Sequence, residues 1–298
     1  MTSADGKEKF DMLIDVTGDG RGSVFLVTGE ANILYEAGMA YCAGAMVERV
    51  AKALGDRPLD AVFLSHSHYD HVAGLPYVRK QWPGVKVYAS ELAKEILVRP
   101  HALAIIRNLS HEAAKAAGAD WDGVYRDEDL RVDTGLSDGQ CLTIGDHRIL
   151  AVETIGHTKC SMVYKIDDIL FLSETIGVMS PDGQYIPAFL VDYKRAMDSI
   201  ERVRKIPAKT LVLSHYGPVR DEDRDGIWDW LETELRESKD KMIGILNSCR
   251  SEEERLAAME RTFHATISKK DQPDAAFFIN AASMLKTLQR QFPEEVRP

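Results

Sequence analysis

A short apolar run that leads directly into a cluster of metal-binding residue types restricts most strongly how this chain can fold. Residues 61–71 read AVFLSHSHYDH, in which the first four letters are typical of a buried strand. Three histidines and an aspartate then fall within six positions. Because alternate residues of an extended segment point to the same side, His66 and His68 can bind one ion while Asp70 and His71 turn toward a second. Imidazole and carboxylate ligands suit zinc, iron or manganese. A histidine-rich surface loop is the alternative interpretation.

The composition is that of an ordinary globular protein. The 298 residues are 45% hydrophobic, which is enough for one large domain or for a domain with a helical appendage. The net charge of −10 argues against a nucleic-acid or anionic-membrane surface, because phosphate groups must be met by clustered lysine and arginine. We find no apolar signal segment and no run long enough to cross a bilayer, so we expect a cytoplasmic protein. The four cysteines lack CxxC spacing, which indicates free thiols.

The first part of the chain alternates between strand and helix patterns. Short apolar stretches with glycine turns predict strands, the first three of them antiparallel. These strands are expected at residues 12–16, 23–27, 33–35, 61–64 and 85–89. Apolar residues at helical spacing predict a helix at 40–54 and a helical insert at about 91–119. The order strand, helix, strand and site is an α/β signature.

A second group of strands and a helical tail complete the pattern. Asp167 and Asp168 form the expected hairpin turn between two of these strands. The strands are predicted at residues 140–144, 147–153, 161–166, 169–173 and 210–213. Helices are predicted at residues 193–204, 226–247, 251–266 and 275–292.

Four further candidate ligands or helpers follow predicted strands or lie in the loops between them. They are His157, Glu174, His215 and Glu36. Strand ends gather at one edge of a sheet, so residues that are far apart in the sequence can meet there. Of the other histidines, His147 is interpreted as an ordinary surface or helix residue, and His264 is given no role.

These motifs together resemble the metallo-β-lactamase superfamily. That family carries an HxHxDH loop, a Gly-His-Thr or Gly-His-Ser turn, a bridging acid and a last histidine, in the order found here. The resemblance covers about residues 10–220. It implies an α/β (α+β) fold, the αββα sandwich, in a domain of residues 1–220 that contains the helical insert. It further implies that residues 221–298 form a C-terminal helical cap over the active site.

The resemblance also implies two divalent metal ions and a hydrolase mechanism. Its ligand assignment gives the first ion to His66, His68 and His157, the second to Asp70, His71 and His215, and the bridge to Glu174. A hydroxide between two such ions is a strong nucleophile at neutral pH, because metal coordination lowers the pKa of water. Asp70 is placed to pass a proton to the leaving group. Tyr69 and Tyr216 could donate a hydrogen bond to a developing oxyanion, or could pack beside the metal loops.

The bridging position departs from the family pattern. It is usually an aspartate, whereas Glu174 offers a carboxylate on a longer arm. Asp167 or Asp168 could serve instead, although the hairpin turn places both at the wrong end of the strand. An aspartate and a glutamate among five histidines are compatible with iron or manganese as well as zinc. Glu36 could orient a ligand histidine, or could be an acid on the surface beside a turn.

Within the superfamily, the chain looks most like the thioesterase-like alkylquinolone-signal response branch. This likeness rests on the helical tail and on residues 68–71, 74–77 and 89–91, which read HYDH, GLPY and ASE. It implies that the substrate is an ester, thioester or lactone of a small molecule. Glyoxalase-type thioesterases share the metal motifs, but we find no basic cluster near the C-terminus like the one they use for glutathione.

Two other functions are considered. An oxygen- or NO-reacting diiron protein would suit a bridging glutamate, although such proteins generally carry an acid where His68 stands and a fused flavodoxin domain. A metal-containing regulatory protein would act through its helical tail. Apolar residues of this tail could pack against the sandwich, line an acyl pocket or form a homodimer interface, and core packing is favoured. These residues are Met242, Ile245, Leu246, Phe263, Phe277, Phe278, Met284 and Leu288.

Overall fold

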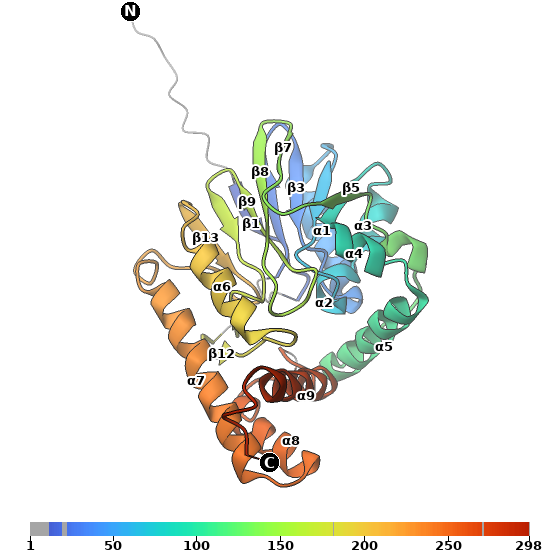
Figure 1. Ribbon diagram of the computed structural model, residues 1–298. Helices are drawn as coiled ribbons and strands as arrows, with labels where there is room; N and C mark the ends of the chain where they lie inside the picture. Colours follow the sequence, from blue (N-terminus) through green and yellow to red (C-terminus); the bar gives the residue numbers. More distant parts are fainter. Residues whose placement is uncertain (1–11, 20–22, 181, 270, 298) are drawn as a thin grey trace, which may run out of the picture.

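The computed structural model describes residues 12–19, 23–180, 182–269 and 271–297, and its main feature is a pair of sheets packed face to face (Figure 1). Residues 1–11, which belong to the expected first domain, lie outside this range. The first sheet has the order β1-β2-β3-β4-β5-β6. Its strands β1 to β3 are antiparallel, and β3 to β6 run parallel. The strands are β1 (Met12–Asp15), β2 (Phe25–Thr28), β3 (Asn32–Tyr35), β4 (Ala61–Phe63), β5 (Lys86–Ser90) and β6 (Thr134–Leu136).

The second sheet has the order β14-β13-β10-β9-β8-β7. Most neighbours in it are antiparallel, and β10 and β13 form its parallel pair. Its strands are β7 (Cys141–Ile144), β8 (His147–Glu153), β9 (Met162–Ile166), β10 (Ile169–Phe171), β13 (Thr210–Leu213) and β14 (Gly217–Pro218). A short separate ribbon pairs β11 (Val178–Met179) with β12 (Tyr185–Ile186).

Aromatic side chains fill the space between the two sheets. The ring of Tyr35 stacks on that of Phe171 with centroids 4.3 Å apart. Phe63 contacts Tyr164 edge to face at 5.1 Å. All four side chains are buried, and alternate positions along each strand supply them, as expected for sheets whose inner faces meet.

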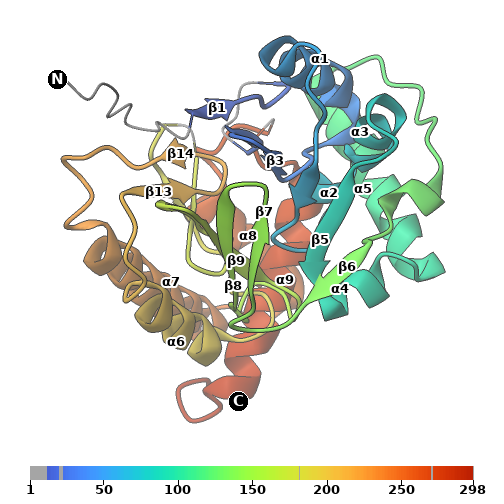
Figure 2. The same ribbon diagram turned by 90° about the horizontal axis from the view of Figure 1, so that it is seen from above.

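Helices cover the outer face of each sheet, which gives the αββα sandwich that the sequence predicts (Figure 2). The first sheet carries α1 (Ala43–Leu54), α2 (Tyr69–Val72), α3 (Leu75–Gln81), α4 (Glu91–Ile96) and α5 (Pro100–Ala117), with the short turns η1 (Ala40–Cys42) and η2 (Asp127–Leu130). The second sheet carries α6 (Tyr193–Val203), α7 (Ile227–Ser248), α8 (Glu252–Phe263) and α9 (Asp274–Gln291). None of the helices described is long and apolar enough to cross a membrane.

The last three helices pack against the second sheet and beneath the sandwich. In Figure 1, α9 (dark red) lies between α5 on one side and α7 and α8 on the other, and α9 contacts all three helices. Met242, Phe277, Met284 and Leu288 are buried in the same cluster as Leu170 of β10, as the preference for core packing predicts. The proposed domain boundary near residue 220 falls between β14 and α7.

The sequence interpretation is wrong for one histidine, His147, while His264, to which it gave no role, is a buried packing residue. His147 is a fully buried residue of β8, whose Nδ1 lies 2.6 Å from the Asp167 carboxylate and whose Nε2 lies 3.1 Å from the Ala31 carbonyl oxygen. His264 is buried as well and stacks on Phe277 with ring centroids 4.3 Å apart. Strand alternation identifies buried positions by their apolar residues. It therefore does not predict the burial of a polar side chain that has a hydrogen-bond partner inside the protein.

Candidate metal centre

The candidate ligands lie where strands of both sheets end. β4 leads through Leu64 and Ser65 into His66 and His68, after which α2 begins and carries Asp70 and His71. In the second sheet, the ligands follow β8, β10 and β13, the last two of which run parallel and therefore end at the same edge. The seven side chains meet there in two groups. The groups are His66, His68, His157 and Glu174, and Asp70, His71, Glu174 and His215.

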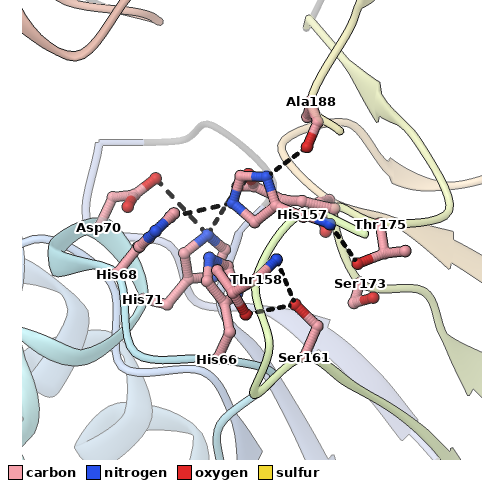
Figure 3. A network of polar contacts seen from close by, with 12 residues as sticks. His66, His68, Asp70, His71, His157, Thr158, Ser161, Ser173, Thr175 and Ala188 are labelled. Atoms are coloured by element: carbon pink, nitrogen blue, oxygen red, sulfur yellow. Dashed lines mark hydrogen bonds and ion pairs between the residues drawn. The ribbon is translucent and has the colours of Figure 1, made fainter. Parts of the chain in front are cut away.

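The first group is built from imidazole rings at close range. His157 Nε2 lies 2.9 Å from His68 Nδ1, and the ring of His66 is centred within 4.8 Å of the rings of both. Figure 3 shows the rings of His66, His68, His71 and His157 turned toward a common point, with Asp70 beside them. Within each group, one ligand atom from each side chain lies within 4.8 Å of every other, which is compact enough for a single ion.

The second group gathers around the carboxylates of Asp70 and Glu174. His71 Nε2 and His215 Nε2 each lie 3.5 Å from Asp70 Oδ2. His71 Nε2 is 2.8 Å, and His215 Nε2 2.7 Å, from the same Oε1 atom of Glu174. Two nitrogen and two carboxylate ligands in one group form a site that suits zinc, iron or manganese.

Glu174 belongs to both groups and presents a different oxygen to each. Its Oε2 lies 2.9 Å from His157 Nε2, whereas its Oε1 faces His71 and His215. Asp167, one of the alternatives considered for the bridge, instead contacts His147 at the hairpin turn. Glu174 is therefore the residue that the two groups share.

The ring nitrogens that point away from the site are held by polar partners. His66 Nδ1 contacts Ser65 Oγ at 2.8 Å, and His157 Nδ1 donates to the Ala188 carbonyl oxygen at 2.7 Å. His215 Nδ1 contacts Ser23 Oγ at 3.0 Å. Such partners fix the ring orientation and leave the Nε2 atoms of these three histidines free to bind metal.

Glu36 plays the same part for His71. Its carboxylate is buried, its Oε1 lies 3.3 Å from His71 Nδ1, and the same oxygen accepts a hydrogen bond from Ser65 N–H at 3.1 Å. The structure therefore agrees with the orienting role and not with a surface acid. Glu36 and His215 both adopt a left-handed backbone, with φ of 63° and 62°, a conformation that costs non-glycine residues about 1–3 kcal/mol and concentrates at functional sites.

Burial and mutual repulsion set the protonation of the rings. Burial, reinforced by the neighbouring His157, lowers the pKa of His68 to about 4. Burial also holds the pKa of His66 well below its usual value, and the nearby His71 adds to this effect. Burial acts against ionisation of Glu174, yet the surrounding histidines, above all His157, hold the pKa of its carboxyl well below the usual range. Burial also opposes a charge on His71 and His215, but the carboxylates of Asp70 and Glu36 hold the pKa of His71 well above its usual value, and Glu174 raises the pKa of His215. Because a metal ion requires neutral imidazoles around an ionised carboxylate, these two rings would release a proton when an ion binds.

The residues present fit a metal ion. His66 Nε2 is fully buried and has no hydrogen-bond partner among the residues described, although it faces three other imidazole rings. A buried polar atom without a partner is rare in a folded protein. A cation bound between these nitrogens would satisfy this atom and neutralise the Glu174 carboxylate.

A cavity of about 760 Å³ opens onto the two groups. Asp70 and Tyr69 both line it, and burial raises the pKa of the Tyr69 hydroxyl well above its usual value, so the hydroxyl stays protonated. Tyr216 packs instead against the hydrophobic cluster of the C-terminal helices and is not among the residues that line the described cavity. The structure thus brings Tyr69, but not Tyr216, to the wall of the candidate site.

The comparisons with known proteins agree with this geometry. The family model "Metallo-beta-lactamase superfamily" matches residues 17–215, which is more than half of the chain. The chain therefore belongs to the metallo-β-lactamase superfamily.

Two curated relatives show how far the sequence similarity extends. A metallo-beta-lactamase fold-containing protein of Sulfurisphaera tokodaii is 28% identical over 167 residues, which cover 54% of this chain and 62% of the relative. A hydroxyacylglutathione hydrolase of Prochlorococcus marinus is 24% identical over 157 residues, which cover 52% of this chain and 49% of the relative. The chain thus spans only about half to three fifths of the length of these relatives.

A solved structure extends the similarity of fold to nearly the whole chain. The metallo-beta-lactamase family protein of Thermus thermophilus superposes with a TM-score of 0.60 and 16% identity, covering 90% of this chain and 88% of that protein. At this identity the likeness concerns the fold alone. The family and the two candidate groups together are consistent with a metal-binding protein.

Proposed function

We propose that the protein is a dinuclear metal-dependent hydrolase that cleaves an ester, thioester or lactone of a small molecule. The observation that carries this proposal is the position of the Glu174 carboxylate. Its Oε2 faces His157, and its Oε1 faces His71 and His215. Two divalent ions, which we propose to be zinc, iron or manganese, would supply a nucleophilic hydroxide at neutral pH and polarise the bond under attack.

The residues around the metal groups have distinct roles in this proposal. Asp70 lies at the cavity wall within reach of a leaving group and accepts and passes on a proton. Tyr69 keeps its proton because of its burial, so its hydroxyl donates a hydrogen bond to the oxygen that gains negative charge. Glu36, Ser65 and Ser23 hold the ligand rings in place. We assign no catalytic role to Tyr216.

The cavity and the relatives support a small carbonyl substrate. The cavity walls combine apolar side chains with polar ones, and the residues of the metal groups form part of the lining, as is usual for small-molecule sites. A curated relative is named a hydroxyacylglutathione hydrolase, an enzyme name that denotes cleavage of a thioester. The thioesterase-like branch suggested by the sequence is consistent with both observations.

The first test is a measurement of metal content beside a hydrolysis assay. Protein purified without added metal is analysed for its elements and assayed with p-nitrophenyl esters, acyl thioesters, lactones and phosphodiesters. Two equivalents of zinc, manganese or iron with turnover of an ester, thioester or lactone is the expected result. Two equivalents of iron, no hydrolysis and rapid reaction of the reduced protein with oxygen would replace the proposal with the diiron alternative.

Variants of the metal groups make the test specific. His68→Ala removes a ligand of the first group and Glu174→Gln weakens the bridge, so both should lose metal and activity. Asp167→Asn is the matched control, because Asp167 also contacts a buried histidine but lies at the hairpin turn. Full activity in both site variants would show that the dinuclear mechanism is wrong.

A further inference from the structure

Helix α9 has two faces with different surroundings. Phe277, Ala281, Met284 and Leu288 point into the core that α9 shares with α7 and the second sheet. A second set of residues at spacings of three and four lines the cavity above the metal groups. This set consists of Ala276, Ile279, Asn280 and Ser283. Because residues with this spacing share one side of a helix, α9 is at once a core helix and a wall of the cavity.

Helices α4 and α5 contribute apolar residues to the same cavity. Leu92 and Ile96 of α4 line it, as do Ile105 and Leu109 of α5, each pair four residues apart. Ile105 and Ile279 are 43% and 55% exposed, which is unusual for isoleucine, and both belong to the cavity lining. They therefore mark its rim, and an apolar molecule that enters between α5 and α9 would cover them.

Asn280 is one of the polar residues that line the cavity beside these apolar side chains. It is partly buried, it lines the cavity, and its amide makes no hydrogen bond with any residue that the structure describes. Ser283, one turn further along, is already satisfied because its hydroxyl donates to the Ile279 carbonyl oxygen at 2.9 Å. Gln272, just before α9, also lines the cavity, and its buried Oε1 has no partner among the described residues. The α9 side therefore offers hydrogen-bonding groups that the fold itself leaves unused.

We propose that Asn280 determines specificity by hydrogen bonding to a polar substituent on an otherwise apolar acyl group. The substrate would place its ester, thioester or lactone carbonyl at the metal groups and its acyl chain between α5 and α9. The substituent would be a hydroxyl, ketone or amide, since each of these can pair with the side-chain amide. This inference rests on the proposed function but concerns the other end of the cavity.

Two measurements test it. The first is kcat/KM for thioesters with unbranched acyl chains from acetyl to dodecanoyl, and for the same chains carrying a hydroxyl at successive positions. The second is calorimetric binding of the corresponding free carboxylic acids, which requires no turnover. The parent protein should favour longer chains and, at one hydroxyl position, prefer the substituted acyl group by about tenfold, the value of one good hydrogen bond in a buried site.

Two variants and two controls locate the effect. Asn280→Leu keeps the side-chain size and should lower the ratio of kcat/KM for the hydroxylated chain to that for the unsubstituted chain by about tenfold. Ala276→Trp fills the cavity and should lower kcat/KM for long chains at least about tenfold relative to acetyl, because the bulky ring takes up space that the chain needs. Gln289→Leu and Gln289→Trp repeat both changes at an exposed position of α9 outside the cavity lining and should have no effect.

The outcomes separate this inference from the proposed function. Hydrolysis with unchanged selectivity in folded Asn280→Leu and Ala276→Phe proteins would overturn the inference and leave the hydrolase intact. The smaller Ala276→Phe change serves if the tryptophan variant fails to fold. Selective binding of hydroxylated acids that Asn280→Leu abolishes, without any hydrolysis by the parent, would support the inference and refute the proposed function.

Discussion

Replacing Glu36 with glutamine should weaken metal binding. The Glu36 Oε1 atom faces His71 Nδ1 at 3.3 Å and accepts from Ser65 N–H, whereas its buried Oε2 has no partner among the described residues. Glutamine keeps the shape and an oxygen for Ser65 but removes the charge that makes His71 a better ligand. Loss of such a partner typically lowers metal affinity about 10- to 100-fold, or about 1.4–2.7 kcal/mol.

Asp167→Asn is the matched control for this variant. Asp167 also holds a buried histidine, His147, at 2.6 Å, and its other oxygen accepts from the backbone N–H of Arg148. This variant loses a charge-assisted hydrogen bond and should lower the free energy of unfolding by about 1.5–3 kcal/mol, with no change in metal affinity. Glu36→Gln keeps the hydrogen bond from Ser65 N–H but loses the charge beside His71 and places an amide where the buried Oε2 has no partner, so it should lower the free energy of unfolding of the metal-free protein by about 1–3 kcal/mol.

The assay is a competition for metal between each variant and a chromophoric chelator, run beside urea denaturation of the metal-free proteins. Metal affinity should fall in Glu36→Gln and stay unchanged in Asp167→Asn. If Glu36→Gln binds metal within about threefold of the parent, or if both variants lose metal affinity equally, Glu36 does not act through His71.

Three further predictions concern packing and thiol chemistry. Leu288→Ala should lower the free energy of unfolding by about 2–5 kcal/mol in urea denaturation, because Leu288 is fully buried in the cluster beneath α9; a cost below about 1 kcal/mol would contradict that packing. Gly156→Ala should lower the free energy of unfolding by about 1–3 kcal/mol and weaken metal binding by displacing His157. The reason is that an added Cβ would lie 2.7 Å from side-chain atoms of Ala196 in α6 and of Thr175 next to Glu174. An unchanged melting temperature and metal content would refute this. Burial, with the nearby carboxylate of Asp19, raises the pKa of Cys42 to about 12, so iodoacetamide should label exposed Cys141 first at every pH below that value. Mass spectrometry of partly labelled protein that shows Cys42 modified as fast would contradict it.

The resemblance of the motifs to the metallo-β-lactamase superfamily predicted the sandwich, and the positions of the candidate ligands after strands predicted that they meet. An apolar strand followed by alternating histidines has few folded arrangements, and parallel strands bring their ends to one edge. His157, Glu174 and His215 could therefore be expected near His66 before their distances were known. The strand boundaries differ from the predicted ones by a residue or two, as fraying and turn geometry commonly produce.

The missed features depend on contacts between distant parts of the chain. Ser23 meets His215 across 192 positions, and no local pattern joins them. The buried state of His147 depends on Asp167 in the hairpin turn between β9 and β10 and on the Ala31 carbonyl oxygen in the turn between β2 and β3. Strands β6, β11 and β12 are only two or three residues long, too short to show alternation. The cavity face of α9 was missed because apolar periodicity identifies only the face in the core.

Each candidate metal group draws its ligands from both sheets. His66 and His68 come from the first sheet and His157 from the second, while Asp70 and His71 face His215 in the same way, and Glu174 joins the two groups. An ion in either group would therefore link the two sheets at the open edge of the sandwich. Separating the sheets at that edge and releasing the metal become one event, so the rate of metal exchange reports how often the sandwich opens.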